Sequence, residues 1–283
     1  MRTILIRLLR VCLGAWPFLH GRGWILRLAR LLLGREPVRF DIGGGTFIEG
    51  PLDDWMILWT FMRLHERDAP FQHSFDLVQR GDVALDVGAN LGIWSLLAAK
   101  RGAQVHAFEP VPSMVERLRG HVARDGAGPI TIHQLALGAE SGSMPFFAVV
   151  EGNSGASALI RRHEGDIEIQ ADVATLDSVL QREKIDRVDF MKIDVEGAEI
   201  LVFRGASQLM ASESAPILFF EMDDQLCASF GTTTREIKQL LLQYGYAIYR
   251  WHDAGFAPVT VEERHGHEDL FALKPQHLAK IVG

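Results

Sequence analysis

Residues 82–110 constrain the fold of this 283-residue chain more than any other stretch. The short apolar run at 83–87 suits a buried strand, and it is followed by a turn that contains two glycines. Apolar residues with helical spacing occupy 91–100, and a second short strand is expected over 104–108. This order of strand, turn, helix and strand predicts a right-handed βαβ crossover with two parallel strands.

The polar residues of this unit predict a pocket for a ligand that contains a nucleoside. Gly88 and Gly92 let the backbone approach a ligand without an intervening Cβ. Glu109 follows Asp86 by 23 residues, close to the interval of ~20 residues for an acid that accepts ribose hydroxyls. NAD and S-adenosylmethionine (SAM) both bind to units of this kind. The turn lacks a Gly-x-Gly-x-x-Gly pyrophosphate loop, and Asp86 would repel a pyrophosphate but attract the ammonium of a methionine moiety, which favours SAM.

A second informative stretch, residues 188–199, ends a buried strand with a charged cluster. Lys192, Asp194 and Glu196 fall within five positions at the end of the strand expected over 188–193. Ligands of open α/β sheets lie at the carboxyl ends of the strands, so we expect this cluster to face the same crevice as the glycine turn. Charges beside an apolar strand are costly unless they are paired or used. The cluster is therefore a candidate catalytic site, and a structural Lys–Asp pair is the alternative.

Charge divides the chain into a basic extension (1–35), a lead-in or cap (36–81) and a main body (82–283). The extension carries seven arginines and no acidic residue, and the remainder carries 22 basic and 36 acidic residues, a net charge of −14. An acidic body argues against DNA or RNA as a partner.

Residues 1–34 show two basic amphipathic helical patterns. Such helices suit an anionic membrane surface, and packing on the body or in a dimer is an equal alternative. The arginines interrupt the apolar runs, so neither a secretory signal nor a span of ~20 apolar residues is expected. The two cysteines form no disulfide framework, so a location in the reducing cytoplasm is expected. The basic helices extend this expectation to peripheral contact with the inner face of the membrane.

Two further stretches border the expected pocket. A helical pattern over 53–67 has an unusually apolar face, which is expected to fill the core and could alternatively cap the site. Glu66, near the end of that pattern, is a candidate cofactor-binding residue. A final pair of strands is expected over 246–251 and 270–273. The loop between them is expected to be solvated, without metal-ligand spacing, and it contains His252, His265 and His267.

Five motifs in order resemble one family over about residues 66–273. They are Leu-Asp-Val-Gly-Ala-Asn-Leu-Gly at 85–92, Ala-Phe-Glu-Pro at 107–110, Ala-Leu-Gly at 136–138, Thr-Leu-Asp at 175–177 and Asp-Phe-Met-Lys-Ile-Asp-Val-Glu-Gly-Ala-Glu at 189–199. The family is that of the FkbM-type SAM-dependent methyltransferases.

The resemblance implies an α/β, Rossmann-like class I methyltransferase fold, with a seven-stranded, mostly parallel sheet, helices on both faces and an antiparallel last strand. It also implies methyl transfer from SAM to a hydroxyl oxygen of a sugar or glycan, a glycolipid or a polyketide-type metabolite. The residues that would hold SAM by position are Asp86, Gly88, Asn90 and Glu109. Those that would line the reaction crevice are Lys192, Asp194 and Glu196.

The expected reaction is an in-line displacement in which the protein mainly aligns and desolvates the reactants. Asp194 is the first candidate for a general base or hydroxyl-orienting group, Glu196 is the second, and Lys192 would hold the carboxylates or stabilise developing charge. No metal site is assigned, although Asp194, Glu196 and Glu221 could instead chelate a divalent cation. Two rival functions remain: an NAD-linked oxidoreductase, and a non-catalytic SAM-binding, membrane-associated assembly protein.

Overall fold

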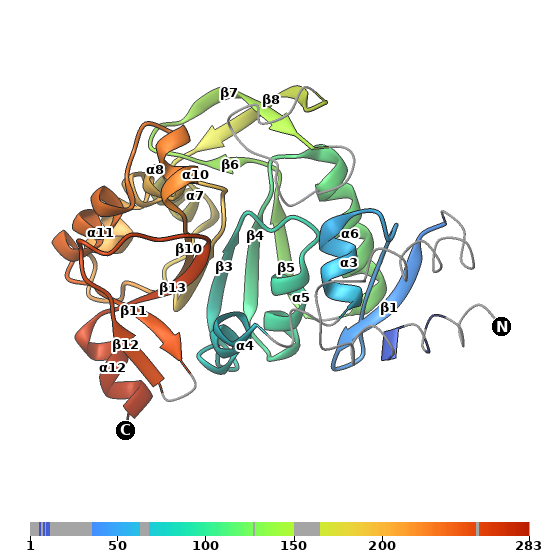
Figure 1. Cartoon of the computed structure of the whole chain (residues 1–283), viewed down its shortest axis with the longest axis horizontal. Helices are drawn as coiled ribbons and strands as arrows, with labels where there is room; N and C mark the ends of the chain where they lie inside the picture. Colours follow the sequence, from blue (N-terminus) through green and yellow to red (C-terminus); the bar gives the residue numbers. More distant parts are fainter. Residues whose placement is uncertain are drawn as a thin grey trace.

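The computed structural model describes residues 6, 8, 10–11, 36–62, 68–126, 128–149, 165–252 and 255–282. Its centre is an eight-stranded sheet with the order β12-β11-β13-β10-β9-β3-β4-β5 (Figure 1). The strands are β3 Val83–Val87, β4 Gln104–Phe108, β5 Ile130–His133, β9 Phe190–Ile193, β10 Ile217–Met222, β11 Ala247–His252, β12 Gly255–Pro258 and β13 Glu268–Leu273.

The strand directions confirm a mostly parallel sheet with an antiparallel final strand. Strands β5, β4, β3, β9 and β10 are parallel neighbours, and β13 inserts between β10 and β11 antiparallel to both. The expected count of seven was one too low, because β12 adds an edge strand on β11. This four-residue strand begins with Gly255 and ends with Pro258, two residue types that weaken a strand pattern.

Helices cover both faces of the sheet. Successive strand residues point to opposite faces, so Ala84 belongs to one hydrophobic cluster and Leu85 to another. The first cluster joins the sheet to α3 Trp55–Phe61, α4 Ala69–Asp76, α5 Ile93–Lys100 and α6 Pro112–Asp125. The second joins it to α7 Leu176–Glu183, α8 Glu199–Gly205, α9 Ser207–Ala211, α10 Asp224–Ser229 and α11 Thr234–Gln243.

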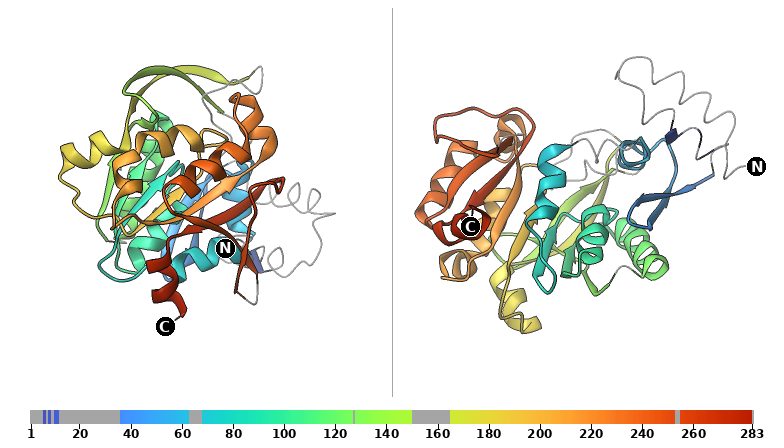
Figure 2. Two further views of the ribbon diagram at one scale, coloured as in Figure 1. Left: turned by 90° about the vertical axis from the view of Figure 1, so that its left-hand side faces the viewer. Right: turned by 90° about the horizontal axis from the view of Figure 1, so that it is seen from below.

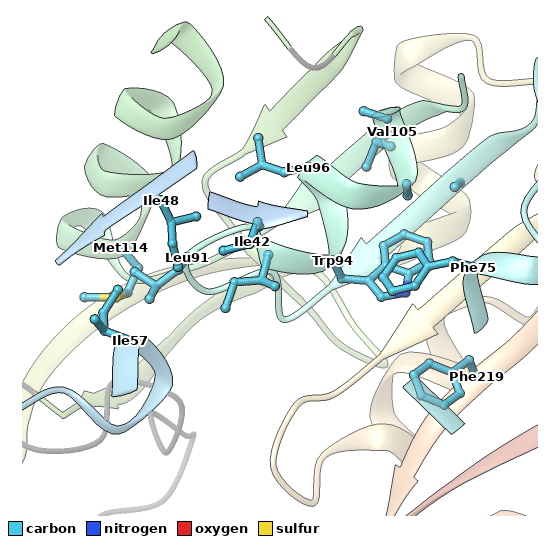
Figure 3. Packing of buried hydrophobic residues seen from close by; sticks show 14 of the residues in the cluster. Ile42, Ile48, Ile57, Phe75, Leu91, Trp94, Leu96, Val105, Met114 and Phe219 are labelled. Carbon is cyan, nitrogen blue, oxygen red and sulfur yellow. The ribbon is translucent and has the colours of Figure 1, made fainter. Parts of the chain in front are cut away.

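The hairpin of β1 (Val38–Gly43) and β2 (Thr46–Gly50) shares a core with this body. The three consecutive glycines at 43–45 turn the chain between the two strands, as the sequence predicts. Ile42 and Ile48 of the hairpin pack near Ile57 and Leu91 (Figure 3). The hairpin and the C-terminal helix α12 (Pro275–Val282) lie at opposite ends of the molecule (Figure 2).

A three-stranded sheet with the order β6-β8-β7 follows the carboxyl end of β5. Its strands are β6 Ala136–Leu137, β7 Gly142–Ala148 and β8 Ile167–Ala174. Among the described residues, no helix combines the length and the apolar character needed to cross a membrane. Glu66 and most of the predicted N-terminal helices lie outside the described residues.

Candidate active site

A cavity of about 290 Å³ lies at the carboxyl ends of β3, β4, β9 and β10. Three kinds of side chain line it. One end presents the turn at 88–91 and Glu109, and the other end presents charged residues in and just after the last residues of β9 and β10. A wall is formed by apolar side chains of α3 and α4. The sheet edge that the sequence predicts for ligand binding is therefore the edge that is hollowed.

Glu109 is fixed by two backbone hydrogen bonds at the end of β4. Its Oε2 accepts the N–H of Asn90 at 2.8 Å, and its Oε1 accepts the N–H of Val111 at 2.9 Å. Burial raises the pKa of Glu109 to about 7, although both hydrogen bonds lower it. Each carboxylate oxygen keeps a second lone pair, so the group can still accept hydroxyl protons from a ligand in the cavity.

The two glycines of the turn are needed for packing within the chain. Gly88 has φ +77°, and a Cβ there would lie 1.9 Å from the carbonyl oxygen of Asp194. Gly92 has φ +78°, and its Cβ would lie 2.0 Å from the side chain of Leu118. Gly88 still lines the cavity, whereas Gly92 does not. The expectation that both glycines make room for a ligand is therefore corrected: the space is taken by the β9 loop and by α6.

Gly88→Ala is expected to lower the free energy of unfolding by about 2–3 kcal/mol, because it combines left-handed backbone strain with displacement of a neighbouring carbonyl. Gly44→Ala is the matched control, since Gly44 has φ +60° and no atom within 4 Å of its Cβ position. That control should cost about 1 kcal/mol. Urea denaturation of both variants checks this, and equal losses would contradict the packing argument.

Lys192 is the centre of a buried ion-pair network. Its Nζ lies 3.2 Å from Asp86 Oδ1 and 3.3 Å from Asp194 Oδ2, and it donates to the carbonyl oxygen of Gly88 at 2.8 Å. Burial alone would lower the pKa of Lys192, but the carboxylates of Asp194 and Asp86 outweigh burial and raise it. The ammonium therefore stays charged and connects the end of β9 to the glycine turn.

Asp86 does not line the cavity. It is fully buried and accepts a hydrogen bond from Ser95 Oγ at 2.6 Å in addition to its ion pair with Lys192. The predicted direct contact between Asp86 and a methionine ammonium is corrected accordingly, because both polar neighbours of the carboxylate belong to the chain. Asp86 therefore acts on the site through its ion pair with Lys192 and through its charge, which adds to burial in raising the pKa of Glu109.

The loop after β9 is held by an acid that is not among the residues predicted from the sequence. Glu199 is 1% exposed, and its Oε1 accepts the N–H groups of Val195 and Gly197, each at 3.2 Å. Burial raises the pKa of Glu199 to about 7. Glu196 lies between the two donors with φ +58°, and it lines the cavity together with Asp194. The acid–Gly–x–acid pattern at 196–199 is the signal that would have identified Glu199.

The acidic end of the cavity continues onto β10 and β13. Glu221 and Asp269 are paired across these antiparallel strands, and both line the cavity. Burial raises the pKa of Glu221 to about 8 and that of Asp269 to about 7. His267 Nδ1 lies 2.6 Å from Glu221 Oε1. The loop histidines are thus not all solvated, because His265 is 3% exposed. His267 is largely exposed but also borders the cavity.

Helix α3 presents two apolar faces. Ile57 and Phe61 are fully buried in the core, whereas Trp55 and Trp59 line the cavity. Trp59 packs edge-to-face against Phe71 of α4 at 5.6 Å. The helix therefore fills the core with one face and borders the site with the other. Both roles that the sequence offered for this segment, core filling and a position at the site, are present.

The structure brings most of the predicted residues to one cavity. Among the described residues, no group of His, Cys, Asp or Glu is arranged to hold a metal ion, so the alternative of a chelated cation gains no geometric support. The predicted residues that line the cavity are Gly88, Asn90, Glu109, Lys192, Asp194 and Glu196.

The strand order, the antiparallel β13 and the cavity at the strand ends define the class I methyltransferase fold. A family model, the methyltransferase FkbM domain, matches residues 86–248, more than half of the chain. The chain belongs to this family. Membership favours a methyltransferase over the NAD-linked oxidoreductase that the βαβ unit left open.

Three curated relatives illustrate the family. Methyltransferase sdnD of Sordaria araneosa is 25% identical over 169 residues, which cover 48% of this chain and 65% of that protein. The 31-O-demethyl-FK506 methyltransferase FkbM of Streptomyces tacrolimicus is 30% identical over 164 residues, 47% of this chain and 62% of that protein. The hexuronic acid methyltransferase AglP of Haloferax volcanii is 24% identical over 157 residues, 55% of this chain and 62% of that protein. The chain thus spans less than two thirds of the length of these relatives.

Proposed function

We propose that this chain is a SAM-dependent O-methyltransferase that acts on a hydroxyl of a sugar or glycan, a glycolipid or a polyketide-type metabolite. One observation carries the proposal. A single cavity has a fixed, buried acid at the carboxyl end of β4 and, opposite it, a charged cluster at the ends of β9 and β10. The first feature suits a nucleoside, and the second suits a polar acceptor beside it.

The side chains present in the cavity fit SAM. Glu109 would accept the ribose hydroxyls, and the apolar wall at 135–137 suits the adenine. Asn90 and Gly88 would border the cofactor through the turn, and the acidic end of the cavity suits the positive methionine portion. When bound, SAM supplies an activated methyl group on a sulfonium. The remaining task of the chain is to align the acceptor and exclude water.

The relatives support a hydroxyl acceptor by the names they carry. One name specifies 31-O-demethyl-FK506 and another specifies a hexuronic acid. In this chain, Asp194 and Glu196 would orient the acceptor hydroxyl, and Lys192 would hold Asp194 in place and balance its charge. The aromatic pair of Trp55 and Trp59 offers a face on which a ring can pack.

Binding and turnover test the proposal separately. Calorimetry with SAM and S-adenosylhomocysteine should show binding of both to the purified chain. Transfer of the label from methyl-labelled SAM to the acceptor would then be measured with glycerol, methyl α-D-glucopyranoside and extracted glycans and glycolipids as acceptors. A folded chain that binds neither compound would refute the assigned cofactor, and binding without any labelled product would favour the non-catalytic SAM-binding alternative.

The N-terminal extension is proposed to contact the cytoplasmic face of the inner membrane. Leu8 and Val11 are 58% and 64% exposed. Arg10 donates from Nε to the Phe61 carbonyl oxygen at 3.3 Å, so this segment also contacts the body. Exposed apolar side chains among arginines suit an anionic surface, where each buried apolar side chain contributes about 1.5–3 kcal/mol.

Deletion of residues 1–34 is expected to abolish partitioning onto vesicles that contain phosphatidylglycerol. The double change Leu8→Ser and Val11→Ser should weaken partitioning by about tenfold or more without removing the Arg10 contact. Leu242→Ser is the matched control, because Leu242 is 46% exposed on α11. Vesicle sedimentation measures the effect, and unchanged partitioning of the deletion would refute membrane contact.

A further inference from the structure

We infer that His267, held by Glu221, takes the proton of the acceptor hydroxyl during methyl transfer. The inference rests on the proposed function and deepens it by assigning the general base of the same cavity. Neither residue belongs to the motifs that carry the family resemblance. Glu221 lies on β10, and His267 immediately precedes β13, the antiparallel neighbour of β10.

Glu221 and His267 form a carboxylate–imidazole pair at the edge of the cavity. Glu221 Oε1 lies 2.6 Å from His267 Nδ1, and the two side chains are 5% and 80% exposed. Above about pH 8 Glu221 is ionised and its carboxylate can only accept hydrogen bonds, so the proton in this contact belongs on Nδ1. The neutral ring then keeps an unprotonated Nε2. This is the arrangement in which a buried acid orients an imidazole for proton transfer.

The residues on both sides of His267 are held by polar side-chain contacts, of which that between Lys238 and His265 is buried. His265 Nδ1 lies 2.7 Å from Glu268 Oε1, and its Nε2 lies 2.9 Å from Lys238 Nζ. Glu268 also accepts two hydrogen bonds from Arg250, at 2.6 and 3.0 Å. Because residues 265 and 268 are fixed, the ring of His267 is placed at the cavity before any ligand binds.

Asp194, the first candidate base from the sequence, has a different environment. Its Oδ2 lies 3.3 Å from the ammonium of Lys192, which also pairs with the buried Asp86. This arrangement suits a group that accepts and orients the acceptor hydroxyl while it remains paired with a cation. We therefore assign orientation to Asp194 and proton removal to His267.

Acidic side chains face His267 from each neighbouring element: Glu221 on β10, Asp269 on β13, Asp194 after β9 and Asp68 before α4. The hydrogen bond to Glu221 is the largest influence on the ring, and with the nearby acids it raises the pKa of His267 to about 9 against the effect of burial. The ring is therefore protonated below about pH 9 and becomes a base above it. Methyl transfer should accelerate as the pH rises through this range.

The proposed step balances in atoms and charge. The acceptor oxygen forms a bond to the methyl carbon as the carbon–sulfur bond breaks, and the electron pair of that bond stays on sulfur. The hydroxyl proton passes to Nε2 of His267 and then to solvent, to which the side chain is 80% exposed. The products are a methyl ether, S-adenosylhomocysteine and one proton, which carries away the positive charge of the sulfonium.

His267→Ala and Glu221→Gln test the assignment, with His252→Ala as the control because His252 is an exposed histidine at the end of β11. We expect His267→Ala to lower kcat about 100- to 1,000-fold while the Kd for SAM stays within twofold. Added imidazole should restore part of the rate. Glu221→Gln keeps an acceptor for Nδ1 but removes the charge, so the midpoint of the pH–rate profile should fall from about 9 toward the ordinary value of about 6.5.

The acceptors are those of the methyl-transfer screen, and titration of ¹³C-labelled histidine by NMR adds a readout that needs no acceptor. A His267 resonance that titrates at the same pH in wild type and Glu221→Gln would overturn the pairing. A kcat for His267→Ala within threefold of wild type would overturn the catalytic role. Wild-type chain that gives no product with any acceptor would instead refute the proposed function, and the inference would fall with it.

Discussion

Glu109→Gln is expected to weaken SAM binding roughly 100- to 1,000-fold. Hydrogen bonds to a charged group contribute about 1.5–3 kcal/mol each, and the loss of two ribose contacts corresponds to roughly 3–4 kcal/mol, or that change in Kd. The carboxylate is 5% exposed and already aligned by the N–H groups of Asn90 and Val111. Calorimetry with SAM and with S-adenosylhomocysteine measures the effect.

The same residue predicts a pH dependence. Because burial raises the pKa of Glu109 to about 7, the carboxyl is ionised above that pH and protonated below it. An ionised group accepts both hydroxyls, so the affinity for SAM should fall as the pH drops through about 7 in wild type and stay flat in Glu109→Gln. Glu116→Gln, on the exposed face of α6, is the matched control. Binding by Glu109→Gln within threefold of wild type would show that this acid does not contact the ligand.

Lys192→Met is expected to lower the free energy of unfolding by about 3–5 kcal/mol, because it leaves the fully buried Asp86 without its cation. A loss of this size is a large part of the 5–15 kcal/mol that stabilises a typical domain. The variant should also release the Gly88 carbonyl and Asp194 from their shared donor. Urea denaturation monitored by circular dichroism gives the comparison.

Two further variants separate charge from packing. Adding Asp86→Asn to Lys192→Met should recover part of the stability, since the remaining neighbour is then uncharged. Arg182→Gln breaks an exposed pair, in which Arg182 and Glu183 are 55% and 38% exposed, and should change stability by less than about 1 kcal/mol. If Lys192→Met is no more destabilised than Arg182→Gln, the ion pair is not important for the fold.

The sequence alone was sufficient to locate the ends of the strands that build the site. The apolar runs at 83–87 and 104–108 form β3 and β4 within the predicted bounds, and the strand expected from Val188 begins at Phe190. Local pattern decides these elements, because a strand buried on both faces reads as a continuous apolar run. Parallel strands end at a common edge, so Glu109 and the cluster after β9 had to lie on the same side of the sheet.

Some side-chain partners could not be predicted, because they depend on burial that is created by distant parts of the chain. Asp86 reads as a free acid at a strand end, but in the fold it is enclosed and faces Lys192. The apolar pattern of α3 does not show that Ile57 enters the core while Trp59 borders the cavity, because that division depends on the elements packed around the helix.

The local sequence therefore determined the βαβ framework, the family and the acids that end its strands. The tertiary structure alone decided which of those acids are paired within the chain and which groups join them at the cavity. The register that sets Glu221 opposite Asp269, and the loop that brings His267 within 2.6 Å of Glu221, arise from strand pairing between distant segments. A periodic pattern carries no information about such pairing, because it reports only which face of an element is buried.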